Sequence, residues 1–300
     1  MYRKIMGFLE AWKESKHRKP LILQGARQVG KTYSILEFGR THYENVAYFN
    51  FETNPKLNET FEENISPDYL IPILSHIAGQ TIVKEKTLMV FDEVQLCERA
   101  LTSLKYFCEN APDYHIIVAG SLLGVAVNRT KFSFPVGKVD MKTLYPMDME
   151  EFMMALGEDD LVNQIKKCFQ TDTPLPSALH DAAMQLYRQY LVVGGMPECV
   201  MQFAGTKDYI LVRHTQDTIL ASYLNDMSKY NTLNEIKKTR LAYDNITVQL
   251  SKKNTRFQYK LIKKSGRASE FENAIEWLCL SGIVSQVYKV EQIKKPLENY

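Results

Sequence analysis

The sequence predicts an α/β protein whose N-terminal half contains a parallel β-sheet. Over the first 150 residues, short apolar runs rich in β-branched and aromatic residues alternate with helical patterns. The runs are almost continuously apolar, which is typical of strands that are buried on both faces of a parallel sheet. After Pro146 the strand signals stop and a succession of helices follows.

The elements are expected in a fixed order along the chain. The predicted strands are Pro20–Gln24, Val46–Phe51, Thr87–Phe91, His115–Ala119 and Lys138–Leu144. Helical patterns at Thr32–Arg40, Asp68–Ile77 and Arg99–Glu109 separate them. Helices continue over residues 148–250, with breaks at Gly157, Thr171–Pro176 and Gly194–Pro197. A further helix is expected at Ser269–Cys279 and a strand at Ile283–Val290.

Composition excludes several classes of protein. The 300 residues are 45% hydrophobic and 24% charged, which excludes wholesale disorder and suggests at least two domains. Five irregularly spaced cysteines without a Cys-x-x-Cys pair argue against a disulfide framework or a zinc site. The N-terminus is charged throughout, unlike a signal peptide, and the longest apolar run, Ile116–Val127, is too short to span a membrane. We therefore expect a cytoplasmic protein without a membrane segment.

A phosphate-binding loop is predicted between the first strand and the first helix. Its residues match the pattern G-x-x-x-x-G-K-S/T at every fixed position: Gly25, Ala26, Arg27, Gln28, Val29, Gly30, Lys31 and Thr32. The glycines let successive N–H groups converge on phosphate oxygens, and the following helix N-terminus adds partial positive charge. Lys31 would neutralise the β- and γ-phosphates of ATP, and Thr32 would bind Mg²⁺.

Two carboxylates follow the strand Thr87–Phe91. Because parallel α/β sheets bind ligands at the carboxyl ends of their strands, Asp92 is expected to orient Mg²⁺ and Glu93 to act as general base for an attacking water. The alternative is an acidic pair at a helix N-terminus.

Two polar residues complete the expected catalytic set. Ser121, after the strand His115–Ala119, would bind the γ-phosphate or the attacking water, unless it is only a helix N-cap. Asn50, at the end of the second strand, would hold Glu93 in an inactive pose, unless it is only a turn residue.

The chain resembles prokaryotic AAA+-type P-loop ATPases. The resemblance rests on LILQGARQVGKT, TLMVFDEVQ, IIVAGSLLG, FPVGKVDMKTLYPMDMEEF, YLVVGGMPE and YLNDMSKY, and it covers nearly the whole chain. It implies a P-loop ATPase core (residues 1–146), a helical lid (147–230) and a small winged-helix-like α+β segment (231–300). It also implies Walker A at Gly25–Thr32, Walker B at Asp92-Glu93 and the sensor-1 position at Ser121.

Two departures from the family limit what the resemblance implies. Members commonly continue into a nuclease-like domain, and this chain stops at Tyr300, near where that domain would begin, so the resemblance does not carry a nuclease activity over to it. Many relatives have Gly-Arg where this chain has Gly137-Lys138, and an arginine suits a charged finger better than a lysine. Arg129, Arg188 and Arg213 remain alternatives for that role in a homo-oligomer, although each is more typical of a surface arginine.

Positive charge is concentrated near the C-terminus. Basic minus acidic side chains give 0 (18 − 18) for residues 1–150, −4 (6 − 10) for 151–230 and +6 (13 − 7) for 231–300. Residues 245–269, called here the basic segment, contain no acidic residue. They carry Lys252, Lys253, Arg256, Lys260, Lys263, Lys264 and Arg267. Such a segment, with Phe257 and Tyr259 interleaved, suits DNA-backbone contact, a solvated surface or a dock for a further domain.

The function expected is Mg²⁺-dependent ATP binding and hydrolysis that drives a conformational change, with DNA as a candidate partner. The alternative is an ATP-dependent switch or DNA-binding regulator with little turnover. A small-molecule kinase is disfavoured because the Asp92-Glu93 arrangement suits activation of water and no acceptor-binding motif is recognisable.

Overall fold

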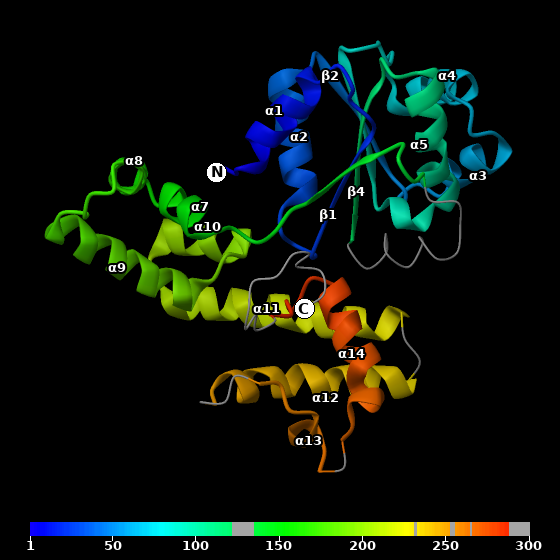
Figure 1. Cartoon of the computed structure of the whole chain (residues 1–300). Coiled ribbons are helices and arrows are strands. Elements are labelled where there is room, and N and C mark those ends of the chain that lie inside the picture. Colours follow the sequence, from blue (N-terminus) through cyan, green and yellow to red (C-terminus); the bar gives the residue numbers. More distant parts are fainter. Residues whose placement is uncertain (122–134, 231–232, 253–255, 265, 288–300) are drawn as a thin grey trace, which may run out of the picture. The chain divides into compact units, whose positions relative to one another are not determined.

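The structure is a computed structural model of the chain and describes residues 1–121, 135–230, 233–252, 256–264 and 266–287. The chain divides into two compact units, Met1–Tyr223 (unit 1) and Leu224–Tyr300 (unit 2). Unit 1 contains the sheet and most of the helices, and unit 2 is helical in its described part (Figure 1).

Unit 1 is built on a five-stranded sheet in the order β2-β3-β4-β1-β5. The strands are β1 (Leu21–Gly25), β2 (Asn45–Asn50), β3 (Thr87–Asp92), β4 (His115–Ser121) and β5 (Asp140–Thr143). Every neighbouring pair is parallel, so all five carboxyl ends lie at one edge. The predicted α/β fold with a parallel sheet is confirmed, and the predicted strand ends differ from the observed ones by at most two residues.

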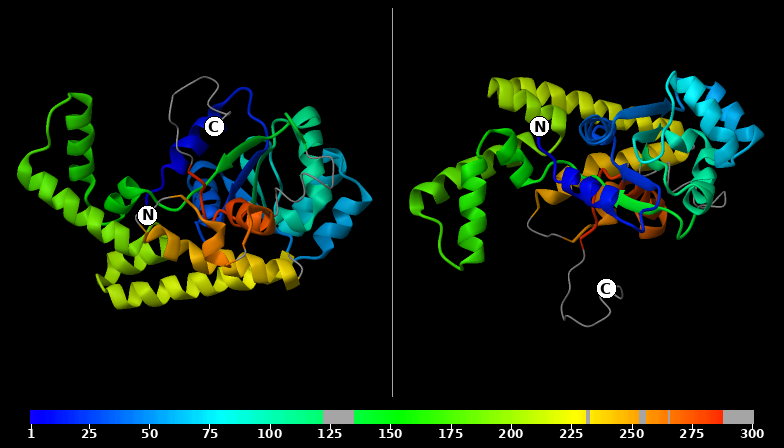
Figure 2. Two further views of the ribbon diagram at one scale, coloured as in Figure 1. Left: turned by 60° about the horizontal axis from the view of Figure 1, so that its bottom comes forward. Right: turned by 90° about the horizontal axis from the view of Figure 1, so that it is seen from above.

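Helices cover both faces of the sheet. On one face lie α1 (Ile5–Glu14) and α2 (Lys31–His42). On the other lie α3 (Lys56–Glu63), α4 (Pro67–Ala78) and α5 (Glu98–Asn110), and Figure 2 gives two further views of this arrangement. A short 3-10 turn, η1 (Val94–Leu96), connects β3 to α5.

The three central strands, β1, β3 and β4, are mostly apolar because each of their faces meets a helix layer, whereas the edge strands β2 and β5 are only partly buried. Toward α3–α5, Phe91 packs edge-on against Phe49, Phe51 and Phe61, and replacing one of these rings by alanine would cost about 3–5 kcal/mol. Toward α2, Leu88 packs beside Gly39, where a Cβ would lie 2.5 Å from the Val46 side chain. This dense core fixes the sheet edge that holds the candidate site.

After β5 the chain of unit 1 is helical. The helices are α7 (Met149–Ala155), α8 (Asp159–Gln170), α9 (Ser177–Val193), α10 (Pro197–Thr206) and α11 (Tyr209–Tyr230), which continues into unit 2. The predicted breaks at Gly157, Thr171–Pro176 and Gly194–Pro197 fall between these helices, as expected. A small apolar core of Met153, Leu161, Val162 and Leu186 joins α7, α8 and α9.

The described part of unit 2 contains α12 (Leu233–Leu250), α13 (Tyr259–Ile262) and α14 (Ala268–Leu280), which confirms the helix predicted at Ser269–Cys279. Phe271, Trp277 and Leu278 on α14 are buried, and α14 packs against α12. The strand predicted at Ile283–Val290 is wrong over residues 283–287, and the rest lies outside the described residues. The N–H groups of Ile283 and Val284 bond back to the Leu278 carbonyl, so these donors are used in ending α14.

The five cysteines are free thiols. Among the described residues, no helix is both long enough and apolar enough to cross a membrane.

Candidate functional site

The loop between β1 and α2 needs its glycines for two different reasons. A Cβ at Gly25 would lie 2.3 Å from the Leu144 carbonyl oxygen just after β5, so only glycine fits there. Gly30 has φ +89° and begins α2 in a conformation that favours glycine. Gln28 also has positive φ (62°). The loop therefore wraps tightly before the helix N-terminus, as an anion-binding loop does.

The Lys31 ammonium group lies within this loop. Its Nζ donates to the carbonyl oxygens of Gly25 (3.1 Å) and Ala26 (2.8 Å). Burial lowers the pKa of Lys31 to about 8. Placing the charged ammonium group here therefore costs desolvation free energy. Such a cost is typical of groups that bind a ligand rather than of groups that stabilise the fold.

Side chains from outside the loop hold its backbone. Arg3 Nη1 donates to the Val29 carbonyl (2.8 Å), and the Tyr223 hydroxyl donates to the Arg27 carbonyl (2.7 Å). Neither residue was predicted to belong to the site. Arg3 lies in no motif, Tyr223 begins the block YLNDMSKY, for which no contact with the loop was expected, and both are far from the loop along the chain.

Asp92, at the end of β3, is the centre of a hydrogen-bond network and is 5% exposed. Its Oδ2 accepts from the Thr32 hydroxyl (3.0 Å) and from the Tyr48 hydroxyl (2.7 Å), and its Oδ1 accepts from the Glu93 N–H (3.0 Å). Burial and the bond to Asp92 raise the pKa of Tyr48 to about 12, so this hydroxyl remains a donor. The Thr32 hydroxyl and the Asp92 carboxylate form an adjacent pair of hard oxygen donors, which fits Mg²⁺.

Glu93 has a backbone conformation that is uncommon for a residue with a side chain. Its φ is 53° and its ψ is 37°, in the left-handed region. Such conformations cost free energy and cluster at functional sites. The Gln95 amide donates to the Glu93 carboxylate and orients it. Gln95 was not among the predicted site residues.

Asn50 has partners other than Glu93. Its Oδ1 accepts from the N–H groups of Glu52 (2.9 Å) and Thr53 (3.0 Å), and its Nδ2 donates to the Tyr48 hydroxyl (3.2 Å). Within the described ranges no hydrogen bond joins Asn50 to Glu93. Asn50 therefore supports a turn and, through Tyr48, the Asp92 network, while Gln95 binds Glu93.

Ser121 pairs with Gly25 in the register of β4 with β1, which places its backbone beside the loop. Its side chain lies outside the described residues.

Among the described residues, the alternatives for a charged finger lie on the surface of unit 1. Lys138 pairs with Glu109 (2.9 Å), and this bond raises the Lys138 pKa. Arg213 pairs with Asp217 (2.9 Å), Arg188 is exposed, and Arg129 lies outside the described residues.

The basic segment of unit 2 presents charge to solvent. Lys253 lies outside the described residues. The other cations of the segment are exposed: Lys252, Arg256, Lys260, Lys263, Lys264 and Arg267. Lys263 pairs with Glu270 (3.0 Å). Two hydrogen bonds join Gln249 to Gln258 within the segment: Gln249 Oε1 accepts from the Gln258 N–H (2.7 Å), and Gln249 Nε2 donates to the Gln258 carbonyl (3.2 Å).

The parallel sheet with this loop defines a P-loop nucleotide-binding fold. Residues 17–153 match a family model described as an AAA domain, which spans the sheet and the start of α7. Over this segment the chain is similar to AAA+-type P-loop ATPases. Residues 184–299 match a domain of unknown function (DUF8612). No curated protein matches the chain.

Among solved structures, the chain is similar to the RuvB Holliday junction branch migration motor of Thermotoga maritima (13% identity, 95% of this chain and 88% of that one, TM-score 0.40). It is also similar to Aeropyrum pernix ORC1 in complex with DNA (13%, 94% and 82%, TM-score 0.36) and AMPPCP-bound DnaA from Aquifex aeolicus (12%, 93% and 90%, TM-score 0.35). Likeness at this level carries nothing about what this chain binds.

Proposed function

We propose that this protein binds ATP with Mg²⁺ and hydrolyses it, and that nucleotide state changes its conformation. The observation that carries the proposal is the arrangement at one sheet edge, where the half-buried Lys31 cation lies near the Thr32–Asp92 pair and Glu93 follows directly. The match of residues 17–153 to the AAA domain family model supports it.

Each group has a separate task in this proposal. The loop N–H groups and Lys31 bind the triphosphate, and Thr32 and Asp92 hold Mg²⁺, which would neutralise phosphate charge. Glu93 takes a proton from the attacking water, and Gln95 sets the direction of its carboxylate. Ser121 is proposed to bind the γ-phosphate or that water. Asn50 acts only through Tyr48, by keeping Asp92 in place.

Three functional parts are proposed along the chain, an ATPase core (1–146), a lid (147–230) and a basic winged-helix-like part (231–300). The exposed cations of the basic segment support DNA-backbone binding by the third part. The free thiols support the expected cytoplasmic location. A homo-oligomer in which a neighbour supplies a cation to the γ-phosphate is also proposed, without an assigned residue.

Steady-state ATP turnover with Mg²⁺, measured with and without DNA, tests the proposal. Lys31→Ala should abolish ATP binding and turnover. Lys86→Ala is the matched control. Lys86 pairs with Glu44, and these residues precede β3 and β2 at the amino ends of the strands, away from the site, so this variant should leave ATP binding and turnover unchanged. If the natural protein turned over ATP no faster than Lys31→Ala, hydrolysis would be refuted.

The second candidate, an ATP-dependent switch with little turnover, is favoured by one observation, the pairing of Lys138 with Glu109, which gives that lysine a structural use. Tight ATP binding with negligible turnover under both conditions would establish it.

A further inference from the structure

Arg3 is a buried guanidinium group that joins three parts of unit 1. Its side chain is 5% exposed, and its donors reach Glu151 Oε1 (Nε, 3.1 Å), the Val29 carbonyl (Nη1, 2.8 Å) and the Tyr145 carbonyl (Nη2, 2.8 Å). Val29 lies in the phosphate-binding loop, whereas Glu151 lies in the first helix after the sheet. One rigid, planar group therefore contacts the loop and the beginning of the helical region together.

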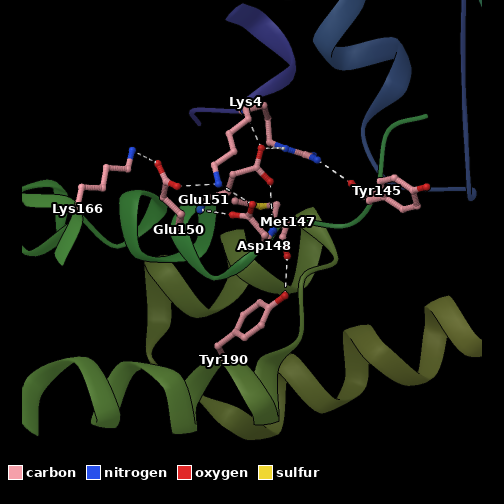
Figure 3. Close-up of polar contacts among 9 residues, drawn as sticks. Lys4, Tyr145, Met147, Asp148, Glu150, Glu151, Lys166 and Tyr190 are labelled. Carbon is pink, nitrogen blue, oxygen red and sulfur yellow. Dashed lines mark hydrogen bonds and ion pairs between the residues drawn. The ribbon is translucent and has the colours of Figure 1, made fainter. Parts of the chain in front are cut away.

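Glu151 has a second role at the N-terminus of α7. Asp148 and Glu151 form a capping box, in which the Asp148 carboxylate accepts from the Glu151 N–H (2.9 Å) and Glu151 Oε2 accepts from the Asp148 N–H (3.2 Å). Glu151 Oε1 accepts from the Lys4 N–H (2.7 Å) as well as from Arg3. Figure 3 shows Glu151 between Lys4 and Asp148 at this helix end. Moving the Glu151 carboxylate therefore weakens the cap of α7.

A buried ion pair of this kind is a poor device for stability alone, because desolvating both charges offsets most of their attraction. It is, however, sensitive to geometry. Val29 directly precedes Gly30, the positive-φ residue at the start of α2, so a change in the loop backbone moves the carbonyl that Arg3 binds. The guanidinium plane cannot follow that carbonyl without changing its contact with Glu151.

We infer that Arg3 and Glu151 form a positioning pair that couples the conformation of the phosphate-binding loop, through the Val29 carbonyl, to the N-terminus of α7. The inference rests on the proposed nucleotide binding. Coupling of this kind is reciprocal: nucleotide in the loop stabilises the cap of α7, and the intact pair tightens nucleotide binding by the same factor.

The double variant Arg3→Met with Glu151→Gln tests the pair in the full chain. It removes both charges together, so no unpaired charge is buried, and glutamine can still serve as the third residue of a capping box. The matched control is Lys4→Met. Lys4 Nζ pairs with Asp148 and Glu150 (both 2.7 Å) at the same helix end, as Figure 3 shows, and within the described part of the chain it makes no hydrogen bond to the loop.

Three quantities are measured for each protein: the affinity for ATP with Mg²⁺, the amide hydrogen exchange of residues 149–155 with and without ATP, and the thermal unfolding midpoint without ATP. In the natural protein, ATP should slow exchange in α7. In the double variant, ATP should no longer slow exchange in α7, and the affinity of the variant for ATP should fall by about 5- to 50-fold. Lys4→Met should keep the exchange response and an affinity within about twofold.

Unchanged ATP affinity together with an unchanged α7 response in the double variant would overturn the inference and leave a structural ion pair. If the double variant does not fold, Arg3→Lys replaces it. Lysine keeps the charge but lacks the fork that reaches Val29, Tyr145 and Glu151 together, so loss of the α7 response would support the inference and its retention would overturn it. Failure of the natural protein to bind ATP would instead refute the proposed function, and this inference with it.

Discussion

The sheet edge of unit 1 and the basic segment of unit 2 both gather groups suited to phosphate, but they are built in opposite ways. At the sheet edge, Asp92 is buried and Lys31 is half-buried, and each is fixed by two or more hydrogen bonds. In the basic segment, Lys260 and Lys264 are exposed to solvent. The first arrangement holds each side chain at a defined position, whereas the second supplies positive charge without holding the side chains at defined positions.

Under the proposed function, the difference corresponds to two kinds of recognition. A triphosphate that must react needs donors held in place before it arrives, and their desolvation is part of the cost. A nucleic-acid backbone that is only held needs cations that release counterions, whatever their side-chain positions. The predictions below separate the two, from the largest expected effect to the smallest.

Glu93→Gln should have the largest effect. Removing the general base should lower ATP turnover by about 10²–10⁴-fold while ATP binding is retained, because the loop donors are untouched. Single-turnover and equilibrium-binding measurements on the same protein check this. Glu44→Gln is the control, because Glu44 precedes the amino end of β2, away from the site. Turnover at the natural rate would show that Glu93 is not the base.

Gly25→Ala should break the tightly built site through its backbone. The new Cβ would meet the Leu144 carbonyl at 2.3 Å, which forces β1 or the residues after β5 to shift. Overpacking of this kind costs about 1–3 kcal/mol of folding stability, and ATP affinity should fall by at least about tenfold. Denaturant unfolding and ATP titration measure both. Gly7→Ala in α1, with nothing within 4 Å of its Cβ, should be neutral or stabilising by about 0.5–1 kcal/mol.

The pH dependence of ATP binding should follow Lys31. With a pKa of about 8, Lys31 loses its charge as pH rises from 7 to 9, so ATP affinity should fall, approaching tenfold per pH unit above 8. The stability of the nucleotide-free fold should change in the opposite direction. Between pH 8 and 10.5 the unfolded chain binds this proton and the folded chain does not, so stability rises with pH.

Titrations of ATP at several pH values and thermal unfolding without ATP measure the two trends. Lys31→Arg provides the comparison, because arginine stays charged over this range and any ATP affinity that it retains should not follow this titration. An affinity of the natural protein that is flat from pH 7 to 9 would contradict the role of Lys31.

Lys260→Gln with Lys264→Gln should have the smallest effect. If the basic segment binds DNA through charge alone, the slope of log affinity against log salt should become shallower by about 0.9 for each lysine that contacts phosphate. Fluorescence anisotropy over a salt series measures this slope. Lys86→Gln with Lys105→Gln in unit 1 should leave it unchanged. Identical slopes for the two double variants would place any DNA contact elsewhere.

The sheet was predictable because its signal is local. β1 and β3 are apolar runs that end in Gly25 and Asp92, and the positions of Lys31 and Thr32 follow from the motif spacing. The supporting residues are not local. Arg3 and Tyr223 reach the loop through tertiary contacts alone, and Tyr48 enters the site only because β2 pairs in register with β3. The incorrect strand after α14 had a strand-like apolar pattern, but backbone donors at Ile283 and Val284 cap the helix instead.

The strand order has a consequence for the synthesis of the protein. β1 is the first strand to leave the ribosome, yet it pairs only with β4 and β5: Leu21 lies opposite Ile117 and Asp140, which are 96 and 119 residues later. Contacts of such long sequence separation form slowly, and here they cannot form until both later strands have been made. The nascent chain therefore carries its phosphate-loop motif for 111 residues, from Thr32 to Thr143, before the strands that flank the loop are complete.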